Sequence, residues 1–172
     1  MASVRAIKSS TLVLEPQVAG HAEEMFAILS DPEIYEHENA PPQSLDWLRS
    51  RYARLESRRS TDGEEQWLNW VIRLPSLELA GYVQATVRGE RALIAYELAS
   101  VHWGRGLGYQ AVDTMISELA TRYGVRNLFA VLKRSNVRSL RLLRRLGFSA
   151  ASAELLAANP VEAGELLMTR QC

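Results

Sequence analysis

The chain has 172 residues, 47% of them hydrophobic and 23% charged, which is typical of a soluble globular protein with a sizeable core. Lys and Arg number 20 together, as do Asp and Glu, so the zero net charge argues against a general attraction to nucleic acid or anionic membranes. The single cysteine, Cys172, excludes an intramolecular disulfide, and no segment approaches the ~20 consecutive apolar residues of a membrane span. We therefore expect one cytoplasmic domain over residues 1–172, without a nucleic-acid or membrane partner and without a metal.

The first third of the chain predicts one strand and two helices. Alternating apolar residues over 10–16 favour a short strand that ends at Pro16. Apolar side chains at helical spacing predict a helix over 21–30, and a second helix follows over 45–59 with Ser44 as its N-cap.

The middle of the chain alternates with the period of strands. Residues 66–74, 78–88 and 92–101 each read as a strand, and turn residues separate them. In the first of these, Leu68, Trp70 and Ile72 share one face. Short connections of this kind predict an antiparallel meander.

The last third alternates helices and strands. A long amphipathic helix is expected from Leu107 to its closing Gly124, followed by a strand buried on both faces over 127–132. A second helix is expected over 136–147, and weaker strands over 148–157 and 165–171. The order β-α-α-β-β-β-α-β-α-β-β predicts a mixed α/β sheet with a parallel portion in its second half.

Three glycines lie between the third strand of the meander and the long helix. Gly104, Gly106 and Gly108 leave the backbone bare where the first N–H groups of that helix lack intrahelical partners, which favours anion binding. A dinucleotide fingerprint needs glycines at relative positions one, three and six, whereas these stand at one, three and five. A Walker loop needs a terminal Gly-Lys-Ser/Thr, which is absent here. Two interpretations of the glycines remain. They bind another phosphate ligand, or they form a turn that only packs the helix on the strand.

The stretch His102–Val112, "HWGRGLGYQAV", resembles the acetyl-coenzyme A pyrophosphate loop of the GNAT N-acetyltransferases, which reads Gln/Arg-x-x-Gly-x-Gly/Ala. Trp103 stands where the superfamily usually has Gln or Arg, as is frequent in the ribosomal-protein N-terminal acetyltransferase (RimJ/RimL-like) branch. Downstream, "NVRSLRLLRRLGF" is similar to the second signature of that branch, Asn-x-x-Ser before an apolar helix ending in Leu-Gly-Phe. The N-terminal segment "STLVLEP" also resembles the branch, except that Glu15 replaces the usual arginine.

This resemblance covers nearly the whole chain and implies the GNAT acyl-CoA N-acyltransferase fold. In that fold a mixed, mostly antiparallel sheet of about seven strands with a parallel central pair is flanked by about four helices. The implied activity is direct transfer of an acetyl group from acetyl-CoA, as co-substrate, to a primary amine by a monomer or homodimer. The implied coenzyme-binding residues are Leu98, Ala99, Val101, Trp103, Gly104, Arg105, Gly106, Leu107, Gly108, Tyr109, Asn136 and Ser139.

Two residues are candidates for the proton transfers. The resemblance implies that Asn136 contacts the pantetheine arm and that Ser139 donates a proton near the sulfur, whereas the residue types alone fit a helix N-cap and a solvated serine. Glu97 interrupts an apolar strand, where an unpaired carboxylate is costly, so we expect either a general base or a member of an ion pair.

The acceptor site is expected beside the connection between the two early helices. Tyr35, Glu36, His37 and Trp47 flank that connection, and Trp70 lies on the first strand of the meander. Together with Glu97, Glu36 and Glu38 would make a locally acidic pocket. The acceptor is either a protein N-terminal amine or a small molecule such as an antibiotic, and a non-catalytic acyl-CoA-binding module and a dinucleotide-dependent oxidoreductase are the rival hypotheses.

A basic run extends from Lys133 to Arg145. It carries six Lys or Arg residues without interleaved aromatics, so a solvated helix face is a better interpretation than a nucleic-acid site. Arg138 or Arg141 is also positioned in sequence to meet the phosphates on the adenosine side of a coenzyme.

Overall fold

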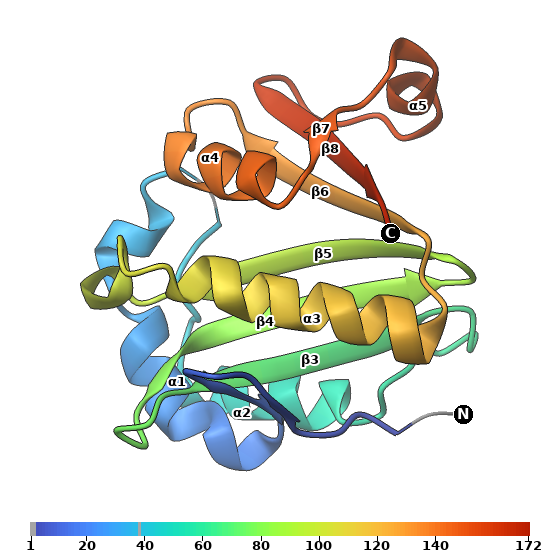
Figure 1. The fold of residues 1–172 in the computed structure, drawn as a ribbon. Coiled ribbons are helices and arrows are strands. Elements are labelled where there is room, and N and C mark those ends of the chain that lie inside the picture. The colour runs from blue at the N-terminus through green and yellow to red at the C-terminus, as the bar shows by residue number, and fades with distance from the viewer. Residues whose placement is uncertain (1–2, 38) are drawn as a thin grey trace.

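The computed structural model describes residues 3–37 and 39–172. Its strands form one eight-stranded sheet in the order β1-β2-β3-β4-β5-β6-β8-β7, and only β5 and β6 pair in parallel among the described residues (Figure 1). The strands are β1 (Ile7–Lys8), β2 (Val13–Pro16), β3 (Gln66–Arg73), β4 (Leu79–Arg88), β5 (Arg91–Leu98), β6 (Asn127–Lys133), β7 (Ser149–Ala150) and β8 (Glu165–Gln171).

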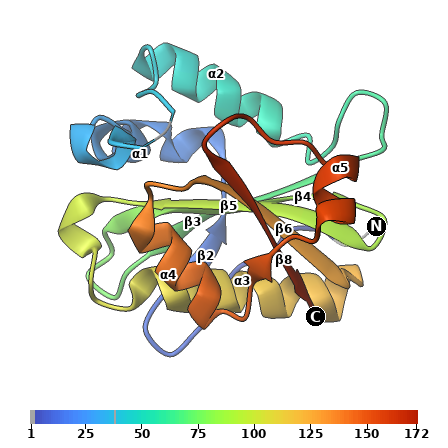
Figure 2. The ribbon, with the colours of Figure 1, turned by 90° about the horizontal axis from the view of Figure 1, so that it is seen from above.

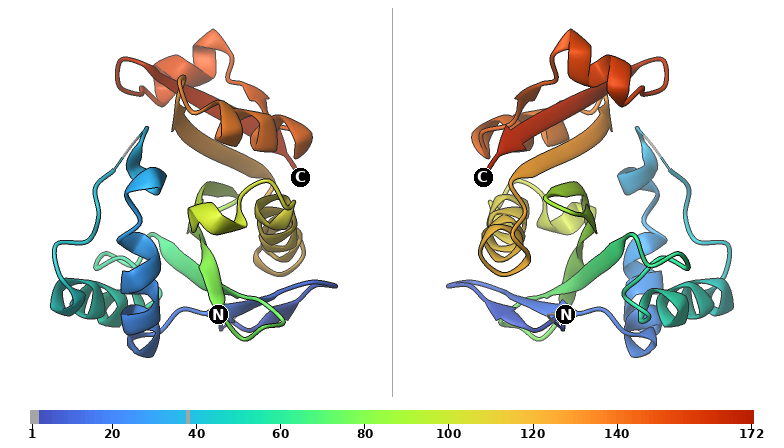
Figure 3. Two further views of the ribbon diagram at one scale, coloured as in Figure 1. Left: turned by 90° about the vertical axis from the view of Figure 1, so that its left-hand side faces the viewer. Right: turned by 90° about the vertical axis from the view of Figure 1, so that its right-hand side faces the viewer.

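Helices cover both faces of this sheet. Figure 2 shows α1 and α2 on one face and α3 and α4 on the other, and Figure 3 shows the same separation from the two sides. The α-helices are α1 (Ala22–Leu29), α2 (Leu45–Leu55), α3 (Leu107–Tyr123), α4 (Val137–Arg145) and α5 (Ala153–Ala158). Short 3₁₀ turns are η1 (Ala19–His21), η2 (Pro32–Tyr35) and η3 (Ser100–His102). No helix in the described residues is both long and apolar enough to cross a membrane.

The strand register assigns alternate residues to the two faces. Trp70 pairs with Val83, and Val83 pairs with Tyr96, so all three point to the face covered by α3 and α4. The adjacent row points to the opposite face, covered by α1 and α2, and in it Tyr82 pairs with both Val71 and Glu97.

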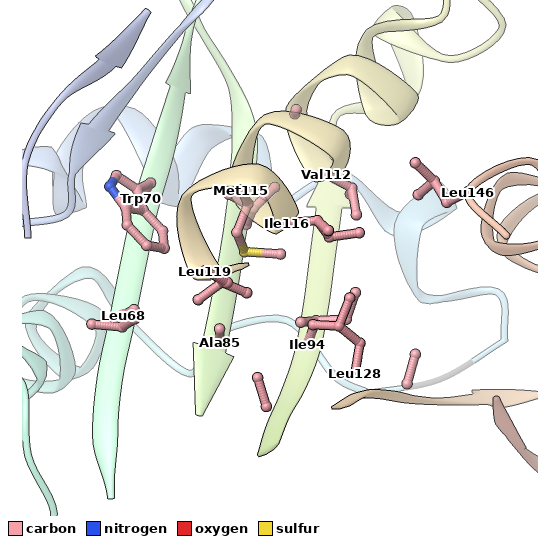
Figure 4. Packing of buried hydrophobic residues seen from close by; sticks show 14 of the residues in the cluster. Leu68, Trp70, Ala85, Ile94, Val112, Met115, Ile116, Leu119, Leu128 and Leu146 are labelled. Carbon is pink, nitrogen blue, oxygen red and sulfur yellow. The ribbon is translucent and has the colours of Figure 1, made fainter. Parts of the chain in front are cut away.

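A separate hydrophobic core fills each of these faces. Buried residues of α3, including Met115 and Leu119, pack on Leu68, Trp70 and the central strands (Figure 4). A second core joins α1 and α2 to the row that contains Val71. Both cores hold the central strands rigid, which is what a site at their ends requires.

The sheet is split between β5 and β6. Parallel pairing covers only Arg91–Leu93 of β5 and Asn127–Phe129 of β6, and beyond these residues the two strands diverge (Figure 1). Among the described residues, strand pairing between β5 and β6 therefore ends at Leu93 and Phe129. The split creates an opening in the middle of the sheet.

The predicted fold class is confirmed, with a few local differences. The chain has β1 in addition to the predicted strands. The expected strand over 148–157 is wrong, because only Ser149–Ala150 pair with β8. Ser152 then caps a helix by accepting a hydrogen bond from the Leu155 N–H at 3.2 Å, and alanine and leucine favour α5 over a strand there.

Candidate functional site

The glycine turn borders a cavity of about 590 Å³ that lies in the opening between β5 and β6. Gly104 and Gly106 have φ angles of 73° and 78°, and a Cβ added at either would meet no other atom within 4 Å, so open space borders both. Gly108 differs, because a Cβ there would approach Leu142 Cδ1 to 2.9 Å, so this glycine allows α3 to pack against α4. Gly106 is the N-cap of α3, and the next three N–H groups have no intrahelical acceptor.

Arginine side chains of α4 make the rim of this first cavity basic. Arg138, Arg141 and Arg145 all line it, at a spacing that places them on one face of the helix. The Arg138 guanidinium lies 3.3 Å from the centre of the Trp103 ring, and Arg145 lies over Tyr109 at 4.8 Å. These stacking contacts connect α4 to the glycine turn around a cavity suited to an anionic ligand.

The start of α4 carries Asn136 and Ser139, and it brings the Ser139 hydroxyl to that of Tyr96. The Asn136 side chain accepts a hydrogen bond from the Ser139 N–H at 3.1 Å, so Asn136 is the N-cap of the helix while it also lines the cavity. Ser139 Oγ lies 2.6 Å from the hydroxyl oxygen of Tyr96 on β5. Both hydroxyl groups belong to residues that line the first cavity, where they can pass a proton along a short chain.

A second cavity, of about 460 Å³, lies on the other face of β5, below α2. Asn39, Tyr82, Ala95 and Glu97 line both cavities, so the two adjoin at these residues, Glu97 among them. Aromatic rings form much of the second wall, contributed by Tyr35, Trp47, Tyr52 and Tyr82. A two-chamber site of this kind can bring two ligands into contact through the split in the sheet.

The Glu97 carboxylate acts on two phenol groups of this wall. Burial, reinforced by the negative charge of Glu97, raises the pKa of Tyr35 to about 12. The same two causes, in the same order, raise the pKa of Tyr82. Both phenols therefore remain protonated near neutral pH, and Tyr35 donates to the Leu29 carbonyl at 2.5 Å.

Asp31 connects the wall of the second cavity to the end of β5. Its carboxylate accepts hydrogen bonds from the N–H and hydroxyl of Ser100 and caps η2 through the Glu33 N–H. The Ser100 hydroxyl is the main reason that the pKa of Asp31 is lowered. Asp31 thus fixes Tyr35 relative to the strand that carries Glu97.

Most of the predicted coenzyme-binding residues line the first cavity, but three do not. Arg105 is exposed outside the lining, Val101 is 71% exposed, and Ala99 is buried with its N–H donated to the Ala80 carbonyl. The Leu98 carbonyl accepts from the Trp103 indole N–H at 3.0 Å, which orients that ring. Those that line the cavity are Leu98, Trp103, Gly104, Gly106, Leu107, Gly108, Tyr109, Asn136 and Ser139.

The predicted acceptor residues divide in the same way. Tyr35 and Trp47 line the second cavity, whereas Glu36 and His37 do not and instead lie 3.7 Å from each other. Trp70 is a correction: it is fully buried against α3, donates to the Arg5 carbonyl and lines neither cavity. Glu38, the third residue of the expected acidic pocket, lies outside the described residues.

The sequence analysis missed several residues that line the first cavity. Tyr96 has the residue type of a proton donor, but its meeting with Ser139 depends on a contact between positions 43 apart in the chain. The signal for Arg145 was available, because it continues the helical spacing of Arg138 and Arg141. His102 also lines the first cavity, and its buried Nδ1 has no hydrogen-bond partner among the described residues.

The structure thus combines a split mixed sheet with a glycine turn and a basic cavity on one side and an aromatic cavity on the other. The family model described as "Acetyltransferase (GNAT) domain" matches residues 11–149, and the chain belongs to this family.

Relatives and solved structures agree with this assignment. The chain is 23% identical over 146 residues to the uncharacterized N-acetyltransferase YoaA of Bacillus subtilis, covering 83% of this chain and 81% of YoaA. RimL, a ribosomal-protein alpha-N-acetyltransferase solved with coenzyme A, has a TM-score of 0.79 at 19% identity, covering 97% of this chain and 98% of RimL. Spermidine N-acetyltransferase from Vibrio cholerae, solved with CoA and spermine, has a TM-score of 0.75 at 16% identity. The match covers 95% of this chain and 96% of that protein.

Proposed function

We propose that the protein transfers the acetyl group of acetyl-CoA to a primary amine, with the coenzyme in the first cavity and the amine in the second. The observation that carries this proposal is that the two cavities meet at Glu97 through the split between β5 and β6. Direct transfer between two ligands requires such a meeting point.

The residues of the first cavity fit the chemistry of coenzyme A. The N–H groups at the start of α3 and the three arginines of α4 suit a diphosphate, and a volume of about 590 Å³ lies in the range of ligand pockets. The backbone of β5 beyond Leu93, where pairing with β6 ends, would bind the amide-containing arm and polarise the carbonyl oxygen. When bound, acetyl-CoA supplies an activated acetyl thioester.

Proton movements are assigned to residues on either side of the meeting point. Glu97 takes a proton from the ammonium group so that the neutral nitrogen forms the new C–N bond. As the C–S bond breaks, Ser139 gives its hydroxyl proton to the departing sulfur, and the proton that the acylated nitrogen loses on becoming an amide returns to Ser139 through solvent. Tyr96, hydrogen-bonded to Ser139 Oγ, positions that hydroxyl.

Thiol release from acetyl-CoA, measured across a panel of amines and short peptides, tests the proposed function. We expect release that depends on the amine, tight binding of coenzyme A by calorimetry, and no stabilisation against heat by NAD(H). Tight coenzyme binding without turnover on any acceptor would instead indicate a non-catalytic acyl-CoA-binding module.

A further inference from the structure

The second cavity carries opposite charges. Among the described residues, its only charged lining side chains are Glu97, on β5, and Arg51, on α2. Glu97 also lines the first cavity, so the negative charge lies at the end where the two cavities join.

Arg51 belongs to the more exposed part of the lining. Its guanidinium carbon lies 5.7 Å from the centre of the Trp47 ring, one helical turn earlier on α2, and Trp47 is 41% exposed. The positive charge and this ring together define an outer end of the cavity, opposite in character to the end at Glu97.

Both charges act on Tyr82, a residue of the cavity wall. Tyr82 lines the cavity, and its pKa is raised by burial and by Glu97 while Arg51 partly opposes that rise. The two charges therefore share one chamber of about 460 Å³, walled by Tyr35, Tyr52 and Tyr82. A ligand with a single positive end would meet Glu97 favourably, but a second positive end would meet Arg51.

We propose that the acceptor is a primary amine that carries a carboxylate on the same molecule, such as an amino acid or a short peptide with an apolar or aromatic side chain. The ammonium group enters toward Glu97, the carboxylate stays at Arg51, and the aromatic wall covers the apolar part. This inference rests on the proposed function, and it opposes a polyamine as the acceptor because Arg51 repels the second cationic end.

Matched acceptors with and without a carboxylate test the inference. The panel contains phenylalanine and its amide, the dipeptide Ala-Phe and its amide, and spermidine, with kcat/KM measured from thiol release. We expect the free carboxylate to be preferred about tenfold in at least one pair, and spermidine to be a poor acceptor. The dipeptide pair is the more informative, because amidation there barely changes the basicity of the amine.

Variants of α2 assign the preference to one side chain. Arg51→Gln should bring the carboxylate-to-amide ratio close to one, and Arg51→Lys should retain most of it. Arg54→Gln is the matched control, since Arg54 is exposed on the same helix and lines neither cavity, so its ratio should equal that of the wild type.

Three results would overturn the inference while leaving the proposed function intact: equal rates on each carboxylate and its amide, a preference that survives in Arg51→Gln, or spermidine as the best acceptor. Absence of thiol release with every amine would instead overturn the proposed function, and this inference with it.

Discussion

The hydroxyl oxygens of Tyr96 and Ser139 lie 2.6 Å apart, joining β5 to the first turn of α4 across the coenzyme-side cavity. This contact gives the Ser139 hydroxyl a defined direction. It also separates the roles of two neighbouring residues of β5, because Tyr96 faces Ser139 and α4 while Glu97 faces the second cavity.

Removing the Tyr96 hydroxyl should slow turnover without weakening coenzyme binding. Tyr96→Phe keeps the ring, and loss of one hydrogen bond to the reacting group, about 1 kcal/mol, lowers kcat roughly fivefold. Ser139→Ala should lower kcat further, and the double variant should be no slower than Ser139→Ala alone, because the tyrosine acts only through the serine. Single-turnover kinetics and calorimetry with coenzyme A measure both effects.

Tyr123→Phe is the control for this pair, since its hydroxyl lies outside both cavities. Equal and additive losses in the two single variants would show that Tyr96 does not act through Ser139.

A negative charge at Gly106 should abolish coenzyme binding while the fold survives. At φ 78° this N-cap position is left-handed, a conformation that Asp and Asn adopt more readily than other L-residues, so the two variants carry similar backbone strain. Gly106→Asp places a carboxylate beside the expected diphosphate, whereas Gly106→Asn has nearly the same shape without charge. We expect calorimetry with coenzyme A to show no binding for Asp and measurable binding for Asn, and equal affinities would contradict the assignment of the turn.

Adding a methyl group at Gly81 should disrupt β5 beside Glu97. A Cβ there would lie 2.0 Å from the Glu97 carbonyl oxygen, and the φ of 152° disfavours any other residue. Gly81→Ala should cost more than about 3 kcal/mol, which lowers Tm by roughly 10 °C in a protein of this size. Gly89→Ala is the control, because a Cβ there meets nothing within 4 Å and only its φ of 57° is unfavourable, at about 1–2 kcal/mol. Similar melting temperatures in the two variants would contradict the close approach.

Stability at acid pH should depend on Glu15. Its carboxylate accepts two hydrogen bonds from the Arg73 guanidinium, at 3.0 and 3.2 Å, and this contact lowers the pKa of Glu15 below its ordinary value of 4.5. A lowered pKa in the folded state means that the ionised carboxylate stabilises the fold above about pH 4.5, and that this contribution is lost as the pH falls through the lowered pKa.

Urea unfolding of the wild type and Glu15→Gln between pH 7 and pH 3 measures this contribution. Glu15 is partly exposed, so the difference should be only about 1 kcal/mol at pH 7 and should shrink toward pH 3. A difference that stayed constant over this range would mean that packing, not charge, is responsible.

The elements themselves could be predicted where the local pattern is strong. Gly124 ends α3 with a φ of 67°, Ser44 caps α2, and Asn136 caps α4, because each of these signals acts within a few residues of its own position. The glycine turn and the Asn-x-x-Ser motif located the first cavity for the same reason. The short helix α5 was missed because its hydrophobic residues fit either period, although the Ser152 cap and the helix propensity of alanine and leucine favour a helix.

The sheet register and the meeting of distant elements came only from the tertiary structure. Successive side chains of a strand point to opposite faces of the sheet. Trp70 therefore lies in the core under α3, while its neighbour Val71 lies on the opposite face together with Glu97. Nothing local in the sequence reports that register. Likewise, the opposite charges of Glu97 and Arg51 share a cavity only because α2 packs over β4 and β5. Local patterns therefore located the coenzyme side of the site, and long-range packing decided the acceptor side.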